Sequence, residues 1–278
     1  MIGLMDFIHY DFLLYTMLGV FFLSLLCGIL SPLLVAKKLA FLGEGVSHST
    51  LLGISISYCL LELQTPLGNF LLTLLITLFL ACFLALATFR QNIPNDSTIG
   101  IFMTVTLALG VIIFQRFSTG QVDLLSFLFG NLLLMTPLDL LFLGILFVLV
   151  MAVIVAPIKS WMYLCYDEQG ARLSGINTKV YHYTLIFLLT FLIVSSVKLA
   201  GVILVNTLLL IPGVLSYKIG RSMKQVFLIS IIFSLTTSLI GLVLANYFSF
   251  PIGPCLAVFQ FVSFLVIIFL IRLKRSFK

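Results

Sequence analysis

The stretch FLLYTMLGVFFLSLLCGILSPLLVA, residues 12–36, contains no charged side chain. A helix needs roughly 20 apolar residues to cross a hydrocarbon core about 30 Å thick, so this stretch predicts a transmembrane helix. Similar runs recur as far as Ile271, and the 278-residue chain is 62% hydrophobic and only 9% charged. That composition excludes a water-soluble globule. The runs are continuous rather than alternating, which favours helices over the strands of a membrane barrel.

The apolar runs predict an all-α transmembrane helical bundle of about nine spans, with a range of eight to ten. The segment 121–135 sets this range, because it is apolar but short and is compatible with a re-entrant piece, an extra helix or an external turn. No soluble domain boundary is evident, so we expect one membrane domain over residues 1–278. The predicted spans are 12–36, 39–61, 67–89, 98–115, 137–157, 181–197, 200–217, 226–246 and 254–271.

The basic residues predict the orientation. With the amino terminus outside and the carboxyl terminus in the cytoplasm, only Arg116 and Lys198 lie outside, and the positive-inside rule is satisfied. This distribution accounts for the net charge of +6, so no nucleic-acid partner is expected. The largest inward loop covers about residues 159–180, with room for one short helix. The basic residues assigned to the cytoplasmic side are Lys37, Lys38, Arg90, Lys159, Arg172, Lys179, Lys218, Arg221, Lys224, Arg272, Lys274, Arg275 and Lys278.

The sequence GEGVSHS, residues 43–49, puts two ionisable side chains inside a predicted span. Glu44 and His48 are four residues apart and therefore share one helical face. A carboxylate oxygen together with an imidazole nitrogen suits zinc, manganese or iron. Two ligands are too few for a permanent site but suit an ion that has to leave again. The alternative from spacing alone is that the two side chains merely pair with each other near the interface.

The chain lacks the GxxxxGK[ST] phosphate loop, and its polar loops are too short to house a nucleotide-binding domain. It is therefore expected to be non-catalytic, with no permanently bound cofactor. Proximity of Ser47 to His48 leaves an intramembrane hydrolase as a remote alternative.

Four segments, in this order, resemble the ABC-3 permeases, the membrane subunits of bacterial importers for zinc, manganese and iron. Residues 37–53 resemble a basic pair followed by an acidic residue, Ser-His and a later glycine, and residues 120–131 resemble a G-x-V-D-L...L-F-G-N stretch. Residues 200–212 resemble a G-V-L-L-V...L-L-I-P motif, and residues 250–254 resemble a P-x-G-P turn. Glu44 stands where the family usually has aspartate, which puts the metal preference in question.

The resemblance implies a homodimeric permease in the bacterial cytoplasmic membrane. Its implied partners are a cytosolic ATPase dimer, an extracytoplasmic metal-binding protein, a second copy of the chain and the lipid bilayer. Glu44 and His48 are then the residues that receive the metal. Within the inward loop, the resemblance assigns coupling to the ATPase to Asp167, Glu168, Ala171 and Gly175.

Three other functions remain open from the residues. A proton-coupled metal transporter would need more membrane-embedded carboxylates than the sequence offers. An ABC importer for a metal chelate or a vitamin would depend on aromatic and apolar lining more than on Glu44 and His48. A structural membrane protein would carry no cargo.

Overall fold

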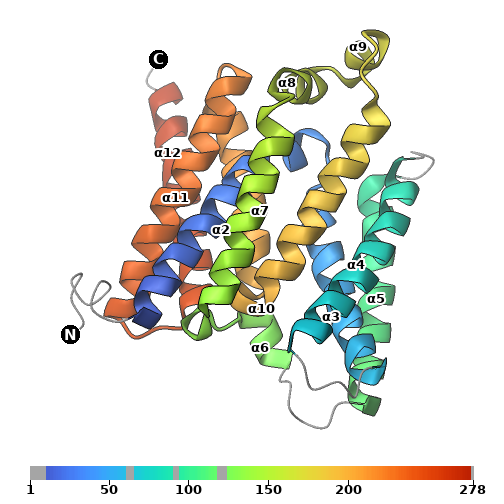
Figure 1. Ribbon diagram of the computed structural model, residues 1–278. Coiled ribbons are helices and arrows are strands. Elements are labelled where there is room, and N and C mark those ends of the chain that lie inside the picture. Colours follow the sequence, from blue (N-terminus) through green and yellow to red (C-terminus); the bar gives the residue numbers. More distant parts are fainter. Residues whose placement is uncertain (1–10, 61–65, 90–93, 118–123, 277–278) are drawn as a thin grey trace.

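The computed structural model describes residues 11–60, 66–89, 94–117 and 124–276 and arranges them as a bundle of helices (Figure 1). Every regular element among these residues is a helix, which confirms the all-α class. Seven helices of the described chain are long and apolar enough to cross a membrane. These are α2 (Asp11–Ala36), α4 (Pro66–Phe89), α5 (Asn95–Phe117), α7 (Pro137–Val155), α10 (Thr178–Ile219), α11 (Met223–Tyr247) and α12 (Ile252–Ser276).

Helix α3 (Leu42–Leu60) is less apolar than these seven and packs among α4, α5 and α10. Its buried hydroxyl groups donate to backbone carbonyl oxygens, as Ser47 does to Gly43 at 2.8 Å. Ser55 donates both to Leu51 at 2.8 Å and to Gly110 of α5 at 3.0 Å. Because these polar groups have partners inside the protein, a serine-rich helix is accommodated in an apolar bundle.

Helices α2 and α10 form the centre of the bundle, whereas α5, α7 and α12 expose most of their apolar side chains. Hydrogen bonds between helices fix α2 in place. The Ser230 hydroxyl of α11 donates to the Gly28 carbonyl at 2.7 Å, and Ser234 donates to the Ser24 carbonyl at 2.9 Å. Small residues at such contacts let membrane helices approach closely.

Helix α10 reverses direction at Gly201, whose φ of 77° and ψ of 160° are not helical. Before this point, the Nε2 atom of His182 lies 3.1 Å from the Oγ1 atom of Thr88, at the end of α4. After it, the Gly213 amide donates to Ser31 near the end of α2. The ends of α2 and α4 lie on the same side of the bundle in Figure 1, so both halves of α10 have contacts on that side. A straight helix of 42 residues would instead extend about 63 Å in one direction. The two halves match the predicted spans 181–197 and 200–217.

Three glycines meet where α10 reverses. A Cβ atom on Gly201 would lie 2.5 Å from the Gly130 nitrogen, and one on Gly253 would lie 2.5 Å from the Phe129 carbonyl oxygen. Gly130 follows the short helix α6 (Leu124–Phe129) and precedes the 3₁₀ turn η1 (Leu132–Leu134). Neither element is long enough to cross a membrane. An extra spanning helix is therefore excluded for the described part of the segment 121–135; residues 121–123 lie outside the described residues.

The opposite end of the bundle carries two short helices, α8 (Ile158–Tyr166) and α9 (Glu168–Leu173), where the sequence suggested room for one (Figure 1). Asp167 separates them, because its extended backbone ends α8 and its side chain caps α9. The carboxyl end of α12 reaches the same end of the bundle. Eleven basic residues assigned to the cytoplasm lie on or next to helix ends at this end: Lys37, Lys38, Lys159, Arg172, Lys179, Lys218, Arg221, Lys224, Arg272, Lys274 and Arg275. Arg90 and Lys278 lie outside the described residues.

Candidate functional site

Glu44 and His48 lie on the first two turns of α3. Among the described residues, no hydrogen bond or ion pair joins their side chains. The Nδ1 atom of His48 is buried and has no hydrogen-bond partner in this part of the chain. The pairing that spacing alone allows is therefore not formed in this conformation.

The Glu44 side chain lines a groove of about 380 Å³ between α3, α10 and α12. Asn206 and Thr207 of α10 contribute the other polar side chains, and Phe261 and Phe264 of α12 close the far wall. The remaining lining residues are Leu210, Ile211 and Val214. A carboxylate facing lipid would be costly, so this groove is a place where water or another protein surface meets Glu44.

Asn206 is a site residue that the sequence interpretation missed. Its Oδ1 atom lies 3.4 Å from the Ser47 hydroxyl, and a Cβ atom on Gly43 would lie 2.9 Å from the same oxygen. The absence of a side chain at Gly43 therefore lets Asn206 approach α3 beside Glu44. The available signal was an amide residue within the apolar run 200–212, where a polar side chain inside a span marks a functional candidate.

The donor set around this groove is incomplete for a permanent metal site. No group of three or more His, Cys, Asp and Glu side chains that could hold a metal ion occurs in the described residues. Glu44 and Asn206 line the groove and offer carboxylate and amide oxygens, whereas His48 lies one turn further along α3 and is not among the lining residues. Oxygen donors together with an imidazole nitrogen suit first-row divalent metals. Structural metal sites are closed by four protein ligands, so this set is better suited to transient contact with an ion.

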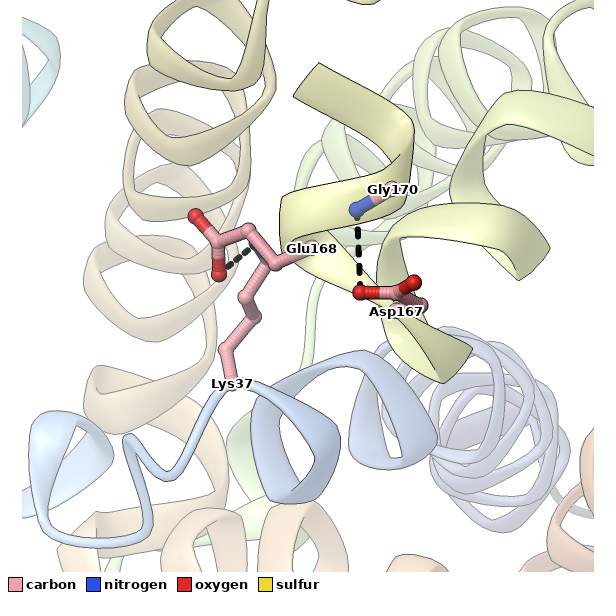
Figure 2. Close-up of polar contacts among 4 residues, drawn as sticks. All are labelled: Lys37, Asp167, Glu168 and Gly170. Atoms are coloured by element: carbon pink, nitrogen blue, oxygen red, sulfur yellow. Dashed lines mark hydrogen bonds and ion pairs between the residues drawn. The ribbon is translucent and has the colours of Figure 1, made fainter. Parts of the chain in front are cut away.

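The residues assigned to ATPase coupling lie on or beside α9. The Asp167 carboxylate accepts a hydrogen bond from the Gly170 amide at 3.0 Å and caps the helix. The Glu168 carboxylate forms an ion pair with Lys37 at the end of α2, with 2.8 Å between Oε2 and Nζ. Figure 2 shows Lys37 extending across to Glu168 while Asp167 turns toward Gly170. Both acidic side chains therefore have partners inside the chain.

The other two coupling residues have structural surroundings of different kinds. Ala171 is fully buried, so it supports α9 from inside and offers no side-chain surface to a partner. Gly175 has a φ of 85° and ends α9: its amide bonds the Arg172 carbonyl, and the next amide, of Ile176, bonds the Ala171 carbonyl. This is the glycine-terminated arrangement typical of helix ends.

Two large apolar side chains are exposed here, Tyr166 at the end of α8 and Leu173 at the end of α9. Tyr166 begins the loop that the resemblance assigns to coupling, whereas Leu173 was not singled out from the sequence. Leu173 is 90% exposed and Tyr166 is 84% exposed. Exposed apolar side chains of this size at the polar end of the bundle are candidates for contact with a partner protein. The available signal for Leu173 was its place as the one large apolar residue in the stretch 167–175. Beneath them, burial raises the pKa of the Cys165 thiol to about 11, although the Lys37 charge acts in the opposite direction.

Comparisons with known proteins agree with this architecture. A "Probable metal transport system membrane protein" of Thermotoga maritima is 31% identical over 94% of this chain and 90% of its own length. A "Probable iron transport system membrane protein" of Haemophilus influenzae is 29% identical over 95% of both chains. Among solved structures, a chain of "PsaBC from Streptococcus pneumoniae in complex with Fab" superposes with a TM-score of 0.80 at 25% identity, covering 94% of this chain and 93% of that one.

The family model described as ABC 3 transport family matches residues 9–271, which is nearly the whole chain. This match confirms the resemblance found in the four sequence segments. Together with seven helices long and apolar enough to cross a membrane, it identifies a multi-pass membrane protein. The chain belongs to the ABC 3 transport family.

Proposed function

We propose that this chain is the permease subunit of an ATP-driven importer of a divalent transition-metal cation. The observation that carries the proposal is the Glu44 carboxylate in a groove between membrane helices, one turn from a His48 nitrogen, with no hydrogen-bond partner for either in the part of the chain that the structure describes. Placing ionisable groups between membrane helices costs free energy, and contact with a cationic cargo would explain why the chain has them. The relatives named for metal and iron transport support the same cargo class.

The groove supports a homodimer as the working unit. Its walls are mostly apolar, and Phe261 of α12 is 50% exposed beside the Glu44 carboxylate. A second copy packed against α3, α10 and α12 would shield this carboxylate from lipid. A two-fold axis there would bring two Glu44 and two His48 side chains to one central path. Four such groups replace much of a cation's hydration shell without closing it permanently.

Nine passages through the membrane are part of this proposal. They comprise six of the apolar helices, the serine-rich α3 and the two halves of α10 on either side of Gly201. An odd count puts Asp11 and Ser276 on opposite sides. The concentration of basic residues at the α8 and α9 end supports a cytoplasmic location for that end and for the end of α12.

The partners follow from what this chain does not contain. The sequence has no phosphate-binding loop, so ATP hydrolysis requires a separate cytosolic subunit. The exposed Leu173 and Tyr166 beside α9 offer that subunit an apolar contact. An extracytoplasmic binding protein would deliver the metal at the end where α6 and η1 lie.

Reconstitution tests this function. The permease, its ATPase and the metal-binding protein are assembled in liposomes, and uptake of radioactive manganese, zinc or ferrous iron is measured. We expect uptake that requires ATP and the binding protein and that persists when a protonophore removes the proton gradient. Uptake driven by the proton gradient without ATP would instead identify a secondary transporter. Transport of an intact chelate but no free ion would identify an importer for organic cargo.

A further inference from the structure

We propose that the Lys37–Glu168 ion pair is the positioning link through which α9 sets the location of Glu44 and His48. This inference rests on the proposed function, because it explains how a partner bound at α9 could act on the cargo residues. The link consists of the ion pair, the rigid corner between α2 and α3, and the first turn of α3.

The ion pair joins two elements that are remote in sequence. Lys37 directly follows α2, and Glu168 begins α9. The Lys37 Nζ and Glu168 Oε2 atoms are 2.8 Å apart, and only 6% of the Lys37 side chain is exposed against 42% of that of Glu168. An enclosed ammonium group that lost its carboxylate would be left uncompensated. The two side chains are therefore expected to move together when α9 moves (Figure 2).

The corner after α2 transmits such a movement because it is rigid. The Leu39 amide bonds the Leu34 carbonyl and the Lys38 amide bonds the Val35 carbonyl, both at 3.1 Å. This pair of bonds is the Schellman arrangement, here with Lys38 rather than glycine at a φ of 55°. Leu39 is fully buried. A corner with two backbone hydrogen bonds and a buried anchor has little freedom to absorb a displacement.

The corner leads directly into the cargo site. The Leu42 amide bonds the Leu39 carbonyl at 2.9 Å, and the Gly45 amide bonds the Phe41 carbonyl at 3.0 Å. Residues 37–42 contain neither glycine nor proline, and Gly43, the residue before Glu44, is buried within α3 against Asn206. Glu44 lies in the first turn of α3, so a displacement of Lys37 reorients its carboxylate in the groove.

Helix α9 is suited to pass a partner's movement to Lys37. Asp167 caps one end and Gly175 ends the other, while fully buried Ala171 anchors the middle. Leu173 is 90% exposed at the end away from Glu168. A partner contacting Leu173 would therefore move α9 as a unit, and Glu168 with it.

The experiment compares ATP hydrolysis with metal uptake in the reconstituted complex. The variants Lys37→Met and Glu168→Gln each break the ion pair, and we expect manganese uptake per ATP hydrolysed to fall about five-fold or more. The charge-swapped variant Lys37→Glu with Glu168→Lys re-forms the pair and is expected to recover much of the coupling. Lys38→Gln is the matched control, since it removes an exposed charge one residue away and should leave the ratio unchanged.

The ratio separates a positioning role from a merely structural one. A merely structural role predicts that hydrolysis and uptake fall together with a constant ratio, and that result would overturn the proposal. An unchanged ratio in both single variants would also overturn it, as would a charge swap no better than either single change. If a single variant does not accumulate, the swap is compared with the pair-retaining Lys37→Arg with Glu168→Asp: similar ratios of uptake to hydrolysis support the proposal, and a swap far below the pair-retaining variant overturns it. A wild-type complex without ATP-dependent uptake would instead refute the proposed function itself.

Discussion

Replacing Gly201 with alanine tests the reversal of α10. The backbone there has a φ of 77° and a ψ of 160°, a region that only glycine adopts readily and that costs other residues about 1–3 kcal/mol. The new Cβ would also lie 2.4 Å from the Phe129 carbonyl carbon and 2.5 Å from the Leu128 oxygen. Both are backbone atoms, so crowding adds about 1–3 kcal/mol. We expect a total destabilisation of about 2–6 kcal/mol.

Thermal unfolding of the purified permease in lipid nanodiscs measures this effect. At about 2 °C per kcal/mol for a chain of this size, the midpoint should fall by about 4–12 °C. Gly144→Ala is the matched control, because a Cβ added there would meet no atom within 4 Å and alanine favours the helix. A Gly201→Ala protein as stable as the control would refute the backbone reversal described for α10.

Three further predictions concern the two ends and the groove. Leu173→Glu should weaken association with the ATPase about ten-fold or more without changing thermal stability, because the side chain is 90% exposed. Pull-down with purified ATPase measures the association, and an unchanged result would remove α9 from the docking surface. In a cysteine-free background, Leu173→Cys should resist an impermeant thiol reagent added outside intact cells, whereas Leu134→Cys, at the 71% exposed last residue of η1, should react. The reverse labelling pattern would invert the topology. Asn206→Leu should raise the KM of manganese uptake more than Thr207→Val does. Equal effects of the two changes would remove Asn206 from the ion path.

Much of the fold could be predicted because lipid imposes long apolar helices. The runs at residues 12–36 and 226–246 fall inside α2 and α11. From the sequence, the reversal of α10 could be anticipated only as the gap between the apolar runs 181–197 and 200–217. Its cause is the conformation of Gly201 and its contact with Gly130, which depend on residues brought together by the fold.

The candidate site was partly predictable for a similar reason. Glu44 and His48 stand out because charged groups in lipid are costly, and helical spacing puts them on one face. Asn206 comes from a distant helix, and its approach depends on the missing side chain at Gly43. Likewise, the family resemblance assigned Glu168 to ATPase coupling, and the ion pair of its carboxylate with Lys37 depends on two elements that the fold brings together.

Metal uptake by Glu44 and His48 variants tests the central claim most directly. Glu44→Gln keeps the size and removes the charge, His48→Ala removes the nitrogen ligand, and Glu44→Asp keeps the charge as a control. Unit charges 4 Å apart attract by about 4 kcal/mol at an effective dielectric constant of about 20, so losing the carboxylate should cost at least about ten-fold in uptake. Uptake is measured per folded complex in liposomes, alongside thermal stability. The account predicts that Glu44→Gln and His48→Ala each lose most uptake while their unfolding midpoints stay within about 2 °C of wild type. Full metal uptake by the Glu44→Gln, His48→Ala double variant would contradict it.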